Sequence, residues 1–222
     1  MKKFNYEEMV YDEIMKYPVG EPIFLKDIIN SIVVKTGCLF RTVRLNVAVM
    51  MGRIIKSGVK VKRFKKGIYY RYEICVFGET VIHRERLLFK KYLVGGIGYE
   101  IGPKLLNALG FTTLLSNLPR TFVSNVASVR SFYDKDLNVN IVKPKAMLTV
   151  NNFRYFQFFD VILMLGTVPV DHHEPLAILQ KFIDFYGLRF DVLFYYGMKY
   201  YKKDVLDVVM RLFGRTLEGG CV

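Results

Sequence analysis

Residues 42–72, TVRLNVAVMMGRIIKSGVKVKRFKKGIYYRY, decide the fold of the N-terminal part of this chain. In the first half, apolar side chains recur at the spacing of one helical face, which predicts a helix over residues 42–57. This apolar stripe consists of Val43, Val47, Met51, Ile54 and Ile55. Gly58 then favours an end to the helix.

The second half of the stretch has the pattern of a β-hairpin. Residues 59–62 alternate apolar and basic side chains, as a half-exposed strand does. Lys65, Lys66 and Gly67 form a turn in which Gly67 supplies the left-handed conformation, and residues 68–72 are the returning strand.

Two further helices precede this segment, over residues 6–17 and 26–35, with residues 21–24 as a short extended link. Three helices followed by a hairpin predict a winged helix-turn-helix over residues 1–77. In such a module the third helix enters the major groove of DNA, and the hairpin lies along an adjacent groove or phosphate ridge.

The same region lacks acidic side chains. None occurs over residues 28–72, whereas an even spread of the chain's 20 acids over 222 residues would place about four there (20/222 × 45). Eleven Lys and Arg lie in the stretch. A patterned basic surface neutralises phosphates and releases their counterions, so we expect nucleic-acid binding. A merely solvated face and a protein-docking module are the alternative interpretations.

Residue chemistry divides the candidate DNA contacts into two groups. Arg and Asn form bidentate pairs with guanine and adenine, so the start of the third helix supplies the expected base contacts, Arg41, Thr42, Arg44 and Asn46. The expected phosphate contacts are the basic side chains at the helix end and in the hairpin, Lys56, Lys60, Lys62, Arg63, Lys65 and Lys66.

Composition limits the class of protein. With 52% hydrophobic and 24% charged residues the chain is expected to be globular. Its longest uncharged apolar run, residues 161–170, is interrupted and shorter than the ~20 residues of a membrane span. Lys2 and Lys3 are followed by Glu7 and Glu8, unlike a signal peptide. We therefore expect a cytoplasmic protein with no membrane partner.

The three cysteines, Cys38, Cys75 and Cys221, have no CxxC spacing and are expected to be reduced thiols. The net charge is +8 over residues 1–76 (15 − 7) and +5 over residues 77–222 (18 − 13). The positive charge is therefore concentrated in the N-terminal third.

Residues 78–222 predict a mixed α+β domain with a small sheet and C-terminal helices. Residues 78–80 are interpreted as a linker. The expected strands cover residues 120–125, 128–133 and 138–143, and the expected helices cover residues 81–94, 103–109, 152–165, 174–186, 191–200 and 203–213.

No motif of this chain predicts catalysis, a cofactor or a metal site, and we do not expect an enzyme. Residues 95–98 are glycine-rich but lack the Lys-Ser/Thr end of a phosphate loop, so they are interpreted as turn glycines. Asp171-His172-His173-Glu174 is the one cluster of metal-ligand types, but adjacent histidines cannot share a helical face. Asp171 is expected to cap a helix with Pro175 in its first turn. An enzyme that uses His172 and His173 remains an alternative.

The order of several segments resembles a known family. The segments are YPVGEPIF (17–24), GRIIKSG (52–58), KGIYY (66–70), GYEIG (98–102), LLNALGFTT (105–113) and YYKK (200–203). In this order they resemble the AbiEi antitoxins of bacterial type IV toxin–antitoxin (abortive infection) systems, over residues 1 to about 165. Residues 105–113 carry the most specific similarity. The family's following Gln and Pro are Leu114 and Ser116 here, which marks the chain as a divergent member.

This resemblance implies a protein of two parts. The winged helix would bind inverted repeats of its own promoter and repress the operon. The second domain would counter a nucleotidyltransferase-like toxin without forming a stable complex with it. The alternative is a winged-helix interaction or RNA-binding protein without antitoxin activity.

Overall fold

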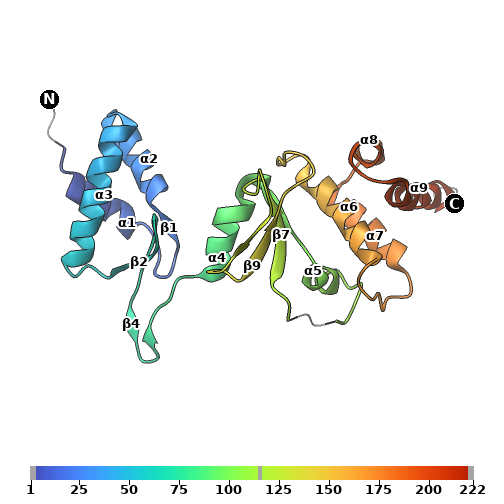
Figure 1. The fold of residues 1–222 in the computed structure, drawn as a ribbon, viewed down its shortest axis with the longest axis horizontal. Coiled ribbons are helices and arrows are strands. Elements are labelled where there is room, and N and C mark those ends of the chain that lie inside the picture. Colours follow the sequence, from blue (N-terminus) through green and yellow to red (C-terminus); the bar gives the residue numbers. More distant parts are fainter. Residues whose placement is uncertain (1–3, 115–116, 220–222) are drawn as a thin grey trace. The chain divides into compact units, whose positions relative to one another are not determined.

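The structure is a computed structural model that describes residues 4–114 and 117–219 (Figure 1). Lys2, Lys3, Ser116 and Cys221, which were named above, lie outside the described residues. The chain divides into two compact units, one ending at Phe89 and the other beginning at Lys90. The N-terminal unit extends past residue 77 because residues 80–88 pack with it: His83 N donates to Gly20 O at 2.8 Å, and Arg86 pairs with Glu21.

Three helices form the core of the N-terminal unit, α1 (Tyr6–Met15), α2 (Leu25–Thr36) and α3 (Phe40–Lys56). Each lies where the sequence predicts it, within a few residues at either end. The apolar stripe of α3 is confirmed, since its first four members are at most 2% exposed, and only Ile55 is half-buried. These side chains pack against Val10, Ile14, Ile28 and Ile32 of α1 and α2.

A three-stranded antiparallel sheet completes this core, in the order β1 (Ile23–Phe24), β3 (Ile68–Arg71) and β2 (Val61–Lys65). The predicted hairpin is β2–β3, and the predicted extended link contains β1. Gly67 adopts φ +78 in the turn, and its carbonyl accepts from Leu25 N at 2.9 Å. Because β1 pairs with β3 right up to this turn, through Phe24 and Ile68, the β2–β3 hairpin does not project beyond the sheet.

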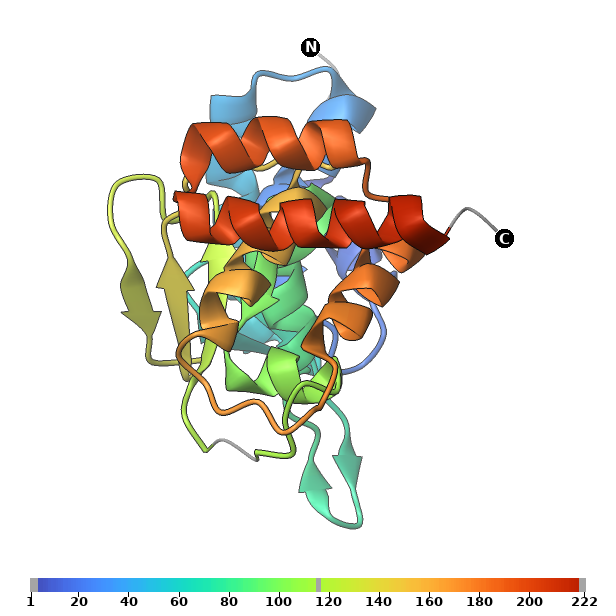
Figure 2. The same ribbon diagram turned by 90° about the vertical axis from the view of Figure 1, so that its right-hand side faces the viewer.

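A second hairpin follows, β4 (Ile74–Cys75) and β5 (Gly78–Glu79), where the sequence predicts a linker at residues 78–80. That prediction was wrong because the Val76-Phe77 turn lacks the usual Asn-Gly signal. Thr80 closes the hairpin through hydrogen bonds from its N and Oγ1 to Glu73 O, at 2.9 and 3.1 Å. In Figures 1 and 2 the hairpin projects from the rest of its unit, and Val76 and Phe77 are 97% and 100% exposed.

The helix predicted over residues 81–94 is shorter and irregular. It consists of α4 (Arg84–Leu88), a π-helical turn η1 (Phe89–Leu93) and a 3-10 turn η2 (Val94–Gly96). Next comes β6 (Gly98–Ile101), a strand that the sequence interpretation missed because it treated residues 95–98 as turn glycines. A Cβ at Gly98 would lie 2.3 Å from Tyr92 O and 2.8 Å from Val123 O. Gly98 therefore permits a close backbone approach within a sheet.

The sheet of the C-terminal unit has the order β6-β7-β9-β8, with β7 (Arg120–Ser124), β8 (Phe132–Asp134) and β9 (Val139–Val142). β7 and β9 are parallel, and the outer pairs are antiparallel. Two of the predicted strands are confirmed, while the middle one begins only at Phe132.

The unit also contains the helices α5 (Pro103–Ala108), α6 (Phe153–Leu165), α7 (Pro175–Tyr186), α8 (Phe190–Tyr200) and α9 (Lys203–Gly219). The sheet and the C-terminal helices confirm a mixed α+β fold. α6 packs on β6 and contacts α7, α8 and α9 (Figure 1), and its Phe156, Phe158 and Phe159 are completely buried. Glu174, not Asp171 as predicted, is the N-cap residue of α7. Among the described residues no helix is long and apolar enough to cross a membrane.

Candidate nucleic-acid interface

The start of α3 exposes most of the residues expected to contact bases. Val43 and Val47 point into the core, which leaves Arg41, Thr42 and Arg44 exposed. Asn46 differs from them, since it is half-buried and its side chain interacts with the Tyr6 hydroxyl. The structure therefore brings Arg41, Thr42 and Arg44 together on solvent-facing helix turns and holds Asn46 against α1.

The middle of the exposed α3 face is apolar, which the sequence interpretation missed. Leu45 is 62% exposed and Val49 is 53% exposed, and Ala48 and Gly52 beside them are exposed too. These positions lie opposite the buried stripe, so helical periodicity alone could have identified them. A surface of this kind can contact thymine methyl groups or an apolar partner.

Lys56 lies at the other end of α3. It follows Arg41 by fifteen residues, which corresponds to about 22 Å along the helix axis. Next to that end, Ile54 and Ser57 share a pocket of about 420 Å³ with Glu7 and Glu8 of α1. Lys56 is therefore separate from Arg41 and Arg44. Lys60 is exposed in the link before β2.

The β2–β3 hairpin exposes Arg63, Lys65 and Lys66. Lys62, by contrast, is half-buried and pairs with Glu79 of β5. Its ammonium lies 4.7 Å from the centre of the Tyr72 ring. The hydrogen bond to the Glu79 carboxylate raises the pKa of Lys62. The charge of Lys62 is therefore already compensated within the protein, whereas Arg63 forms no ion pair with the residues that the structure describes.

Another carboxylate of the unit, Glu13, is paired with lysines outside the candidate interface. Glu13 is buried and bonds to Lys16 and Lys35 at 2.6 and 2.5 Å. Burial opposes ionisation of Glu13, but the bonds from these lysines outweigh it and lower its pKa. Because Glu13 has these partners, it does not neutralise Arg41, Arg44 or Arg63.

In the C-terminal unit the Asp171–Glu174 cluster serves as a loop anchor. Asp171 Oδ2 accepts from Thr113 N and Oγ1, both at 2.8 Å, and from Thr112 Oγ1 at 3.2 Å. The bonds from Thr113 lower the pKa of Asp171. His172 Nδ1 accepts from Glu174 N at 3.0 Å. Within the described part of the chain, no three His, Cys, Asp or Glu side chains are grouped to hold a metal ion.

The same unit buries a carboxyl inside a polar cluster. Asp160 of α6 accepts from Tyr99 Oη at 2.7 Å and from Tyr201 Oη at 3.1 Å, and Lys145 Nζ lies 3.9 Å away. Burial raises the pKa of Asp160 against the lowering effect of these donors. The cluster joins β6, α6 and the α8–α9 link, which is a structural role, so no catalytic role is assigned to it.

Comparison with protein-family models, with curated proteins and with solved structures returned no match to this chain.

Proposed function

We propose that this chain is the antitoxin and transcriptional autorepressor of a type IV toxin–antitoxin (abortive infection, phage defence) operon, and that its N-terminal unit binds double-stranded DNA as a winged helix-turn-helix. The observation that carries DNA binding is the group Arg41, Thr42 and Arg44, exposed at the start of α3 in a unit whose hairpin also exposes basic side chains. The element order α1-β1-α2-α3-β2-β3 supports the module, as does the three-residue α2–α3 link at residues 37–39.

The two groups of contacts have different roles. α3 enters the major groove, where Arg41 and Arg44 contact base edges and Leu45 and Val49 contact thymine methyls. Arg63, Lys65 and Lys66 contact phosphates and set the register of the protein on the duplex, with Lys56, Lys60 and Lys62 as weaker contributors.

DNA binding is tested with promoter fragments that contain the inverted repeats. Arg44→Ala should remove about 1–3 kcal/mol of discrimination between promoter and random duplex. The double variant Lys65→Ala/Lys66→Ala should weaken binding to both duplexes alike. It should also reduce the slope of log K against log salt by the amount expected for the loss of one to two phosphate contacts. Lys26→Ala, an exposed lysine on α2, is the matched control and should bind like wild type. Wild-type binding by both interface variants would rule out this interface.

The antitoxin role of the C-terminal unit rests on the resemblance of residues 98–113 and 200–203 to AbiEi antitoxins. A nucleotidyltransferase-like reading frame beside the gene should encode the toxin, and co-expression of the two should restore growth. Failure to restore growth would remove the antitoxin role and leave the repressor role standing.

The exposed apolar residues of α3 favour one second candidate, an interaction or RNA-binding protein without antitoxin activity. The variant Leu45→Ser/Val49→Ser separates the two candidates. If α3 binds DNA as proposed, this variant should change the preference of the protein for A·T base pairs in the repeat. Unchanged promoter binding, together with strong binding of structured RNA or loss of a protein partner, would favour the second candidate.

A further inference from the structure

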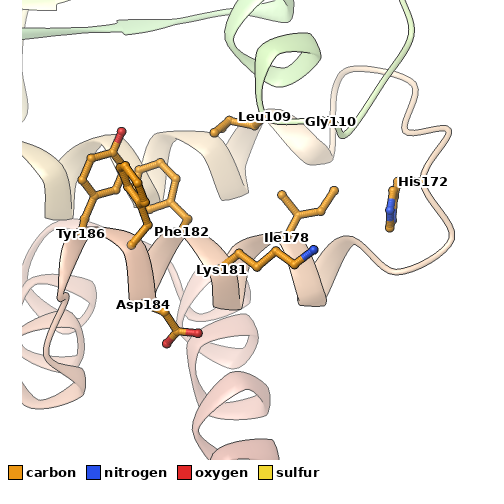
Figure 3. A pocket seen from close by; sticks show the side chains of 9 residues that line it. Leu109, Gly110, His172, Ile178, Lys181, Phe182, Asp184 and Tyr186 are labelled. Atoms are coloured by element: carbon orange, nitrogen blue, oxygen red, sulfur yellow. The ribbon is translucent and has the colours of Figure 1, made fainter.

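A pocket of about 640 Å³ lies between α7 and two loops of the C-terminal unit (Figure 3). α7 supplies one wall, which includes Ile178, Lys181 and Phe182, while Leu109 and Gly110 after α5 supply the opposite wall. Small-molecule sites typically have volumes of about 300–1,000 Å³ and combine apolar walls with a few placed polar groups. The volume and the lining of this pocket fit that description.

Polar and apolar groups occupy different ends of the pocket. In Figure 3 the Lys181 side chain extends toward the His172 end, whereas Phe182 and Tyr186 lie at the other end. Asp184 is directed away from the Leu109 side, and its Oδ1 accepts from Gln180 Nε2 at 2.9 Å. Lys181 is exposed and forms no ion pair in the part of the chain that the structure describes. Its ammonium is available to an anion.

The second polar group is held in place by the anchored loop. Phe111 O accepts from Asp171 N at 3.0 Å and from His172 N at 3.3 Å, in addition to the bonds that the Asp171 carboxylate accepts from Thr112 and Thr113. Because His172 Nδ1 accepts from Glu174 N, the proton of a neutral ring is on Nε2. His172 therefore offers a fixed N–H donor at the same end as Lys181.

The apolar end is aromatic. The rings of Phe182 and Tyr186 lie 4.6 Å apart between centroids, and Phe185 stands edge-on to Tyr186 at 4.8 Å and 88°. The Arg154 guanidinium covers the Tyr186 ring at 4.1 Å, which holds that ring in place. Phe185 is 81% exposed, so this wall includes a largely solvent-exposed aromatic ring. Flat rings stack on such walls.

We propose that this pocket binds a small planar aromatic anion, a nucleoside monophosphate or an aryl carboxylate, with its ring against Phe182, Phe185 and Tyr186 and its anionic group toward Lys181 and His172. The proposal goes beyond DNA binding, since it concerns residues of the C-terminal unit alone. The two sources of ligand share one chemistry: a flat ring at one end and an anion at the other.

The experiment is calorimetric titration of the full chain with AMP, GMP, CMP and UMP in one arm and with indole-3-acetate and benzoate in the other. We expect saturable binding of at least one of these compounds. Lys181→Ala should weaken it about tenfold or more, as loss of a charge-assisted hydrogen bond does, and Phe185→Ala should weaken it at least severalfold. Both variants alter exposed side chains, which protects the fold.

Matched controls remove the same groups outside the pocket. Lys104→Ala changes an exposed lysine on α5, and Phe77→Ala changes the fully exposed phenylalanine of the β4–β5 turn. Both should bind the ligand like wild type. The proposal is overturned if none of the six compounds binds, or if Lys181→Ala and Phe185→Ala bind as tightly as their controls. Which arm binds decides between the two sources.

Discussion

Gly98 and Asp134 show how single residues are fixed by the groups that folding places around them. At Gly98 the carbonyls of Tyr92 and Val123 leave no room for a side chain. At Asp134 the Lys91 ammonium and the Tyr92 hydroxyl both bond to Oδ2 at 2.6 Å, and the carboxylate is buried. Each position has a measurable consequence for stability.

Gly98→Ala should destabilise the C-terminal unit by about 3 kcal/mol, because the new methyl group meets backbone that cannot rotate away. Gly166→Ala is the matched control, since it is exposed and its new Cβ would make an ordinary contact of 3.6 Å. Denaturant unfolding followed by circular dichroism measures both. Equal stability of the two variants would show that β6 does not pack as described.

The stability contributed by Asp134 should depend on pH. Burial opposes its ionisation, but the hydrogen bonds from Lys91 and Tyr92 outweigh burial and lower its pKa to about 2 from an ordinary 3.8. A depressed pKa stabilises the fold above the unfolded-state value, and this contribution is lost as pH falls from about 4 to about 2. Asp134→Asn should therefore cost about 2 kcal/mol at pH 7.

The measurement is the free energy of unfolding of wild type and Asp134→Asn between pH 2 and pH 7. The difference between the two proteins should shrink across the acid window. A difference that stays constant down to pH 2 would mean that the charge of Asp134 is not what stabilises the fold.

At the scale of elements, two hairpins share the basic region of the N-terminal unit. The β2–β3 hairpin ends level with β1, and the β4–β5 hairpin projects instead (Figures 1 and 2). The pair between Lys62 and Glu79 connects the two hairpins. Glu79 of one hairpin thus offsets the positive charge of Lys62 in the other.

Glu79→Gln should strengthen DNA binding, because Lys62 becomes free to neutralise a phosphate. The slope of log K against log salt should steepen by about 0.9, the value for one contact. Glu73→Gln is the matched control, since it changes net charge equally and its exposed side chain lies before β4. Salt titrations of a random duplex by fluorescence anisotropy decide this: identical slopes for the two variants would show that Lys62 does not contact phosphate.

At the scale of the whole molecule, the two proposed binding activities lie in different units. One hydrophobic cluster lies within residues 10–69, and two further clusters lie within residues 99–212. Arg44 belongs to the N-terminal unit and Lys181 to the C-terminal unit.

DNA binding and aryl-anion binding should therefore be separable. Lys181→Ala should keep wild-type promoter affinity, and Arg44→Ala should keep wild-type affinity for whichever aromatic anion binds. Anisotropy and calorimetry on both variants measure this. A loss of both activities in either variant would show that the units are energetically coupled.

The sequence by itself determined the features that depend on local spacing. The 3.6-residue period located α3 and its buried face, and Gly67 located the β2–β3 turn, because helical facing and left-handed turns depend on neighbouring residues. The same locality made the exposure of Arg41 and Arg44 predictable. Local sequence patterns also predicted most of the C-terminal helices.

Only the tertiary structure decided which distant residues meet. The Lys62–Glu79 pair, the contact between Asn46 and Tyr6, and the strand role of Gly98 each depend on chain segments brought together by folding. The pocket is the clearest case, since Gly110 and Lys181 are 71 residues apart and no local pattern relates them. Such contacts depend on how whole helices and strands pack together, which the hydrophobic period and the secondary-structure propensity of a segment do not specify.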